Sequence, residues 1–380
     1  MKSGTRAGLK KCKRVLIKIG SQVLSTGQGL NNRVIERICD DLSLMMDKGK
    51  EFAVVSSGAI AQGTAIMSIP DKETALSKKQ ALAAIGQGSL MRAYTDAFRR
   101  YGHIAAQILI TREDLDNRRR YLNIRNTFSS LFEFGAIPII NENDTVSVDE
   151  IQFTDNDMLA AMIVPLVEAH LMIILTDIEG LYSKDPKAHK DATIIHEIPE
   201  LRPKDLKVYS DVANPMGRGG IKSKLQAAYR ASLLGVPTII ASAYIPQVIS
   251  QILDGSQIGT FVHPKKKAML TQKDHWLGFV SRPKGKIFVD DGAAAMVLNK
   301  GKSLLPVGVV DVEGSFHAGD PVEIIQKGSE VIAIGLSNFA TEELIKIKGE
   351  STKDLASILA YDCDEEVVHR NNMILRKEIL

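Results

Sequence analysis

The chain has 380 residues, of which 44% are hydrophobic and 24% are charged, as in an ordinary soluble globular protein. This length is too great for one small core and predicts two domains, with three as the alternative. The formal net charge is only +3, from 48 basic and 45 acidic residues, so the overall charge does not indicate a nucleic-acid or an anionic-membrane partner.

Targeting and redox signals are weak. No stretch approaches 18 uninterrupted apolar residues, and we therefore expect no membrane span. The basic segment 1–13 is not followed by an apolar core, so we do not expect a secretory signal. Cys12, Cys39 and Cys363 lie far apart and fit no metal-ligand spacing, and we interpret them as reduced thiols of a cytoplasmic protein.

Polar residues follow four apolar runs of strand length. These runs are 14–19, 52–55, 137–140 and 171–175, and they end in Gly-Ser, Ser-Ser-Gly, Asn-Glu-Asn-Asp and Thr-Asp respectively. Helical patterns lie between and after them, at 34–46, 78–101, 118–134 and from 158 onward, where Pro165 should bend or end the helix. This alternation predicts a mainly parallel sheet in a three-layer αβα sandwich. Because the carboxyl ends of parallel strands share one edge, these polar groups should converge there.

Two of these strand ends allow two interpretations each. Lys18 either faces solvent on an edge strand or projects towards an anion, since a buried lysine is costly unless its charge is met. The acidic residues at 141–144 and 154–157 either form turns and cap the next helix, or surround a polar ligand. Two acidic groups that bracket one loop favour the ligand.

A glycine-rich turn at 217–220 leads into a predicted helix that carries Lys222 and Lys224 near its start. Free backbone N–H groups and positive charge suit a polyphosphate, although the turn lacks the Walker A order and an empty tight turn is the alternative. Phosphoryl transfer needs alignment and charge neutralisation by Lys, Mg²⁺ and N–H groups rather than a protein nucleophile. Neither Gly-x-Ser-x-Gly nor His-Glu-x-x-His is present. The residues therefore predict a kinase with a small polar acceptor.

The pattern changes after His263. Short strands at 286–289, 309–312, 321–325 and 331–336 and a helical piece at 292–300 predict a small, mostly β, barrel-like module. We therefore predict a first domain at 1–263, a linker at 264–283, a second domain at 284–362 and a C-terminal tail at 363–380. From 264 to 380 there are 16 basic and 17 acidic residues, a net of −1, whereas a dedicated RNA-binding surface is normally basic.

Taken together, six blocks resemble the amino acid kinase family. The resemblance is collinear from about Arg14 to His263, and the region after about Lys284 resembles a PUA domain. The Asn-Glu-Asn-Asp block and the PUA-like region resemble the branch that phosphorylates glutamate, whereas the Lys-Ile-Gly and Gly-Gly blocks are shared with kinases of other acceptors. The blocks are 15–21, 55–61, 138–144, 153–157, 175–182 and 219–228.

The resemblance implies a fold, a reaction and partners. The fold is the αβα sandwich of this family, and the reaction is ATP-dependent phosphorylation of the γ-carboxylate of L-glutamate with Mg²⁺, the first step of proline synthesis. It further implies inhibition by proline at the acceptor pocket and a homo-oligomer, either a dimer or a tetramer. The alternatives are a different acceptor within the same family and an RNA-binding protein acting through the PUA domain.

The resemblance also assigns residues. It implies that Lys18 and Lys224 stabilise the transferring phosphoryl group and that Asp157 positions these lysines, with no metal ligand assigned. The spacing from the glycines favours Lys224 over Lys222 for the main phosphate contact, although either is possible. The acceptor positions are Ser57, Asp144 and Asn156, and the nucleotide positions are Lys18, Thr176, Asp177, Arg218, Gly219, Gly220, Ile221, Lys222, Ser223 and Lys224.

Overall fold

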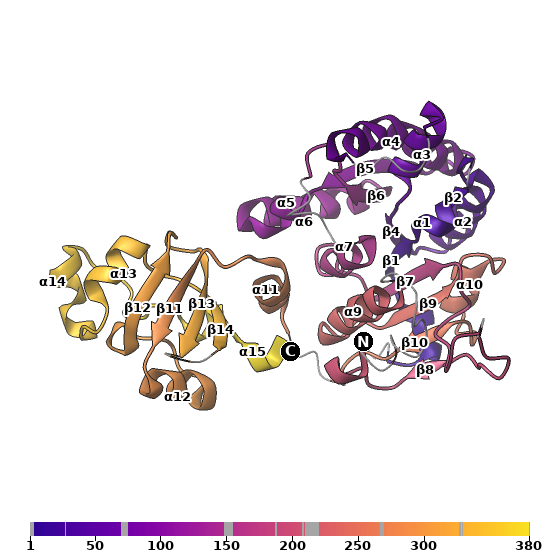
Figure 1. Cartoon of the computed structure of the whole chain (residues 1–380). Helices are drawn as coiled ribbons and strands as arrows, with labels where there is room; N and C mark the ends of the chain where they lie inside the picture. The colour runs from indigo at the N-terminus through magenta and orange to yellow at the C-terminus, as the bar shows by residue number, and fades with distance from the viewer. Residues whose placement is uncertain are drawn as a thin grey trace. The chain divides into compact units, whose positions relative to one another are not determined.

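The computed structural model describes residues 4–26, 28–69, 75–147, 155–186, 188–206, 209, 220–266, 270–326, 328 and 330–379. The chain divides into two compact units, Met1–Met269 and Leu270–Leu380. Both units are drawn in Figure 1. Among the described residues, we find no helix that combines the length and the apolar character needed to cross a membrane.

An eight-stranded sheet forms the centre of the first unit, in the order β5-β6-β4-β1-β7-β9-β10-β8. All neighbouring strands are parallel except β9 and β10, which are antiparallel. The mainly parallel sheet is therefore confirmed. The strands are β1 (Arg14–Ile19), β4 (Glu51–Val55), β5 (Ile104–Ile110), β6 (Ala136–Glu142), β7 (Leu171–Thr176), β8 (Glu197–Ile198), β9 (Thr238–Ser242) and β10 (Thr260–Val262).

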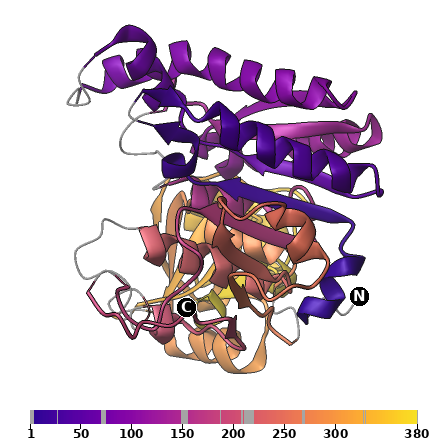
Figure 2. The ribbon, with the colours of Figure 1, turned by 90° about the vertical axis from the view of Figure 1, so that its right-hand side faces the viewer.

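Helices cover both faces of this sheet (Figure 1). On one face, α2 (Asn32–Met46), α4 (Leu76–Arg99) and α10 (Val248–Leu253) share a buried core with alternate strand residues. Figure 2 views the unit from the side of α2 and α10. On the other face lie α6 (Arg118–Glu133), α7 (Asn156–Ile163) and α9 (Gly220–Leu233). The three-layer αβα class is thereby confirmed.

Shorter elements connect these layers. They are η1 (Arg6–Lys11), α1 (Ser21–Leu24), the hairpin strands β2 (Ser25–Thr26) and β3 (Gly29–Leu30), α3 (Ala59–Met67) and α5 (Arg112–Asp116).

Helix α7 is short for a physical reason. It ends at Ile163, two residues before Pro165, whose ring nitrogen has no hydrogen to donate to the preceding turn. The early end expected from Pro165 is therefore present. Its start is fixed by the carboxylate of Asp155, which accepts hydrogen bonds from the backbone N–H groups of Asp157 and Met158. Capping by Asp155 leaves the neighbouring Asp157 for another role.

Helices α3 and α4 approach closely because each carries a glycine at the crossing. A Cβ atom on Gly63 would lie 1.9 Å from the carbonyl oxygen of Leu82, and one on Gly86 would lie 1.9 Å from that of Ala59. No side chain fits at either position. This contact holds α4 against the segment that follows β4, which belongs to the candidate site.

The second unit contains a five-stranded sheet in the order β12-β11-β13-β14-β15. The four predicted strands and the predicted helix are present, whereas the predictions missed the short helices and β15, which is only three residues long. A separate hydrophobic core lies against this sheet. The elements are α11 (Gln272–His275), η2 (Trp276–Val280), β11 (Gly285–Val289), α12 (Asp291–Lys300), η3 (Pro306–Gly308), β12 (Val309–Gly314), β13 (Pro321–Gln326), β14 (Val331–Leu336), α13 (Thr341–Ile347), η4 (Thr352–Asp354), α14 (Leu355–Leu359), η5 (Arg370–Asn372), β15 (Met373–Leu375) and α15 (Arg376–Ile379).

Candidate active site

Lys18 lies in the central strand β1, between β4 and β7, and only 5% of its surface is exposed. The alternative of a solvent-facing lysine on an edge strand is therefore wrong. Alternation along the strand sends Val15, Ile17 and Ile19 into the core shared with α2 and α10, so Lys18 projects from the opposite face. On that face its Nζ lies 2.6 Å from Oδ1 of Asp157 on α7.

Lys224 approaches the same carboxylate from α9. Its Nζ lies 3.0 Å from Oδ2 of Asp157, so one carboxylate holds two ammonium groups, each on a different oxygen. The side chain of Asp157 is 3% exposed, and those of Lys18 and Lys224 are 6% and 12% exposed. The structure thus brings together the two lysines that were predicted to stabilise the phosphoryl group and the carboxylate that was predicted to position them.

This trio is a cationic centre with limited access to water. Two ammonium groups and one carboxylate leave one excess positive charge, which an anion can neutralise. Burial lowers the pKa of Lys18, Asp157 opposes this by attraction, and the charge of Lys224 lowers it further. Asp157 therefore helps to keep Lys18 protonated, which is the state that stabilises phosphate.

Apart from Lys18, the candidate nucleotide residues that the structure describes lie at the C-terminal end of β7 and at the start of α9. Thr176 is buried and its hydroxyl donates to the exposed carboxylate of Asp177 over 3.0 Å. Gly220, Ile221, Lys222 and Ser223 form the first turn of α9, where backbone N–H groups are free of intrahelical partners. Arg218 and Gly219 lie outside the described residues.

The two lysines of α9 have different surroundings. Lys222 is exposed, whereas Lys224 is ion-paired to Asp157 and also donates to the carbonyl oxygen of Gly220 over 3.3 Å. Between them, the buried hydroxyl of Ser223 has no hydrogen-bond partner among the described residues. These surroundings support Lys224, rather than Lys222, as the lysine that acts with Lys18.

The candidate acceptor residues Ser57 and Asn156 are in direct contact. Nδ2 of Asn156 donates to Oγ of Ser57 over 2.9 Å, to the carbonyl oxygen of Ser56 over 2.5 Å and to Oδ1 of Asn141 over 3.0 Å. Ser57 precedes Gly58, whose φ of 98° turns the chain from β4 into α3. The left-handed conformation suits glycine because a side chain is disfavoured there.

Asp144 ends the Asn-Glu-Asn-Asp stretch, whose first two residues belong to β6. Burial, assisted by the nearby negative charge of Glu142, raises the pKa of Asp144 to about 6. The positive charge of an ammonium group would stabilise the ionised carboxylate of Asp144. Its surroundings therefore suit an amino-acid ligand.

Three site residues were missed by sequence reasoning. Asn141 lies in the Asn-Glu-Asn-Asp block but was given no role, and its amide contacts Asn156. Gln87 and Tyr94 belong to α4, where Gln87 contacts Asn141 and the hydroxyl of Tyr94 lies 3.0 Å from Oγ of Ser56. A polar residue on a long helix carries no local signal of such contacts. Only the seven-residue spacing between Gln87 and Tyr94 places them on one helix face.

A family comparison matches the amino acid kinase family at residues 13–242 and a PUA domain at residues 285–359. The first match covers the whole trio of Lys18, Asp157 and Lys224. The chain therefore belongs to the amino acid kinase family and carries a PUA domain.

Two curated relatives refine this placement. The chain is 43% identical over 363 residues to the glutamate 5-kinase of Thermoanaerobacter sp. (strain X514), covering 95% of this chain and 97% of the relative. It is 43% identical over 368 residues to the glutamate 5-kinase of Geobacter metallireducens, covering 97% and 98%. Within the amino acid kinases, the chain belongs to the glutamate 5-kinase family. A UMP kinase from Bacillus anthracis aligns with 67% of this chain and 97% of its own, at 16% identity and a TM-score of 0.47.

Proposed function

We propose that this protein transfers the γ-phosphoryl group of ATP to the γ-carboxylate of L-glutamate, giving L-glutamyl 5-phosphate for proline synthesis. The observation that carries the proposal is the buried carboxylate of Asp157 between Nζ of Lys18 and Nζ of Lys224, at 2.6 and 3.0 Å. The names of the relatives, which cover nearly the whole chain, support glutamate as the acceptor.

The reaction requires an oxygen of the γ-carboxylate to attack the γ-phosphorus while the bond to the β-phosphate oxygen of ADP breaks. Negative charge collects on the transferring group and on the leaving ADP. Two fixed ammonium groups can stabilise both without reorganisation, because Asp157 holds them before the substrate arrives. We assign Lys18 and Lys224 to this task and Asp157 to their positioning.

The nucleotide phosphates fit the start of α9. The N–H groups of Gly220, Ile221 and Lys222, which have no partner within the helix as described, and the positive end of the helix favour phosphate oxygens. Among the described residues there is no group of three or more acidic, His or Cys side chains that could hold a metal alone. In such sites Mg²⁺ is held largely by phosphate oxygens and water. When bound, Mg²⁺ neutralises phosphate charge.

The acceptor fits the other half of the site. Asp144 and the amide oxygen of Asn156 suit the ammonium group of an amino acid, and Ser57 offers a hydroxyl for a carboxylate. The test is an ADP-release assay with L-glutamate, L-aspartate, N-acetyl-L-glutamate and UMP. We expect turnover with L-glutamate and little with the others. Turnover of another acceptor with none of L-glutamate would refute the acceptor, and no turnover of any would refute the kinase.

We also propose that proline inhibits by occupying the acceptor site, since, like glutamate, it carries a positively charged α-nitrogen and an α-carboxylate. Millimolar proline should raise the KM for L-glutamate and leave the KM for ATP unchanged. Glutamate kinetics that ignore proline would refute this.

We further propose a homo-oligomer, a dimer or a tetramer. Within the described part of the chain, the edge strand β5 pairs only with β6. It leaves Ile104 65% exposed and Leu109 36% exposed, and Ile85 on α4 is 39% exposed. Open strand edges and apolar side chains favour association. Light scattering on the protein as it elutes from a size-exclusion column measures its mass. A monomer at assay concentrations would exclude the homo-oligomer.

A further inference from the structure

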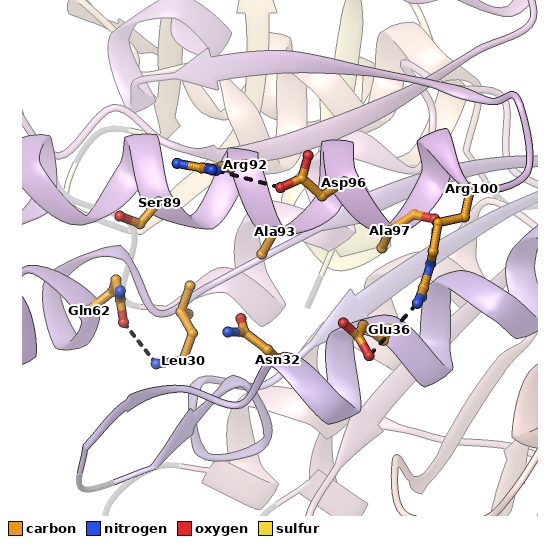
Figure 3. A pocket seen from close by; sticks show the side chains of 10 residues that line it. All are labelled: Leu30, Asn32, Glu36, Gln62, Ser89, Arg92, Ala93, Asp96, Ala97 and Arg100. Atoms are coloured by element: carbon orange, nitrogen blue, oxygen red, sulfur yellow. Dashed lines mark hydrogen bonds and ion pairs between the residues drawn. The ribbon is translucent and has the colours of Figure 1, made fainter.

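One face of helix α4 contacts, at intervals of seven residues, the segment after β6 and two residues that bind Asn156. Nε2 of Gln80 donates to the carbonyl oxygen of Ser147 over 2.9 Å, Oε1 of Gln87 accepts from Asn141 over 3.0 Å, and the hydroxyl of Tyr94 meets Ser56. The glycine contacts with α3 hold this helix in place. Figure 3 shows the neighbouring part of α4, from Ser89 to Arg100. There the charged residues that line a pocket pair with one another, as Arg92 does with Asp96 at 3.5 Å.

The orientation of each amide group in the acceptor site is determined by its hydrogen-bond partners. The carbonyl oxygen of Ser56 can only accept, so the atom of Asn156 that faces it must be the NH₂ group. This NH₂ group also faces Asn141, which must therefore present its oxygen. The NH₂ group of Asn141 then faces position 87, which must offer an acceptor. Gln87 does so with Oε1.

An unpaired nitrogen of Gln87 indicates that Asn141 determines the orientation of the Gln87 amide. Nε2 of Gln87 is buried and has no hydrogen-bond partner among the described residues. A buried donor left unpaired is unfavourable. Rotating the Gln87 amide would bring its NH₂ group against that of Asn141, which is worse. The orientation of Gln87 is therefore imposed by Asn141 and not by the surroundings of its own nitrogen.

We infer that Gln87 is a positioning residue for the acceptor amino acid, acting through the amides of Asn141 and Asn156. With its NH₂ group committed, Asn156 has its Oδ1 on the other edge of the amide, able to accept from an ammonium group. The hydroxyl of Ser57 accepts from Asn156, which leaves its proton to donate to a carboxylate. The inference rests on the proposed function, since it assigns a residue to the same acceptor site.

The test is Gln87→Met, which keeps the length of the side chain and removes the acceptor. The Asn141 amide is then free to rotate and to oppose the NH₂ group of Asn156. We expect the KM for L-glutamate to rise about tenfold, as loss of one hydrogen-bond acceptor commonly causes. The KM for ATP and kcat should stay within about twofold, because the lysine trio is untouched.

The matched control is Gln251→Met. Gln251 is a half-buried helical glutamine of the same unit, on α10, and its Nε2 donates to the carbonyl oxygen of Pro246 over 2.7 Å. This variant should keep the glutamate KM of the wild type. If Gln87→Met does not fold, Gln87→Ala and Gln251→Ala replace the pair under the same criterion.

A double-mutant cycle separates this role from a merely structural one. Asn141→Ala removes the amide that connects Gln87 to Asn156. Adding Gln87→Met to this variant should therefore change the glutamate KM by less than about twofold. Additive effects in the double variant, an unchanged KM in Gln87→Met, or equal rises in both KM values would overturn the inference. The wild type is assayed first on the acceptor panel, and its failure there refutes the proposed function alone. In that case the same double-mutant cycle is measured through the affinity of each variant for L-glutamate, determined by calorimetry.

Discussion

The replacement Asp157→Asn removes the negative charge between two buried lysines and keeps the size of the side chain. In the wild type, the carboxylate is 3% exposed and lies 2.6 Å from Nζ of Lys18 and 3.0 Å from Nζ of Lys224. The amide can still accept a hydrogen bond through one oxygen, but it cannot neutralise either ammonium group. The variant therefore isolates the charge of Asp157.

Two effects of different size are expected. Leaving buried charges without their partner costs roughly 3–5 kcal/mol of the free energy of unfolding. For a unit of this size, that lowers Tm by on the order of 10 °C. Loss of preorganised charge around the phosphoryl group should lower kcat by about 10² to 10³. The pKa of Lys18, already lowered by burial, loses the attraction that opposes this shift and falls further.

The assays are thermal unfolding and a pH–rate profile with ATP and L-glutamate. A lysine with a lower pKa loses its proton at a lower pH. The fall of kcat at alkaline pH should therefore begin at lower pH in Asp157→Asn than in the wild type. The control is Asp41→Asn. Asp41 is 4% exposed and its carboxylate accepts from the N–H groups of Ile249 and Ser250 at the start of α10. It should lower Tm and leave kcat within about twofold.

An Asp157→Asn enzyme with kcat within threefold of the wild type would refute the role of the trio. So would an equal loss of kcat in Asp41→Asn, because the effect would then follow stability and not the charge at the site.

Further variants test each half of the site. Lys18→Ala and Lys224→Ala should each lower kcat by roughly 10² or more, and effects under threefold for both would remove them from the mechanism. Lys222→Ala should have a much smaller effect on kcat, because Lys222 is exposed; an equal effect would reverse the assignment of the lysines. Asp144→Asn should raise the glutamate KM with ATP kinetics nearly intact. In the wild type, kcat/KM for glutamate should fall as pH drops through about 6, where Asp144 takes up a proton, and Asp144→Asn should lack this inflection.

Much of the fold was predictable because it is encoded locally. Strands β1 and β14 begin and end where the apolar runs do, since each run is bounded by turn-forming residues. The early end of α7 follows from one proline. The sequence left two interpretations of the acidic residues around α7, a helix cap or a ligand site. Asp155 is a helix cap, whereas Asp157, two residues later, pairs with the lysines.

The sequence by itself determined the order of strands and helices and the polar residues that end each strand, because short-range patterns fix these features. Only the tertiary structure decided that Lys18 is buried, that Asp157 bridges it to Lys224 and that Gln87 joins the acceptor site. Lys224 and Asp157 are 67 residues apart in the chain, and Gln87 and Asn141 are 54 apart. Such pairs meet through sheet order and helix packing, which no local pattern specifies.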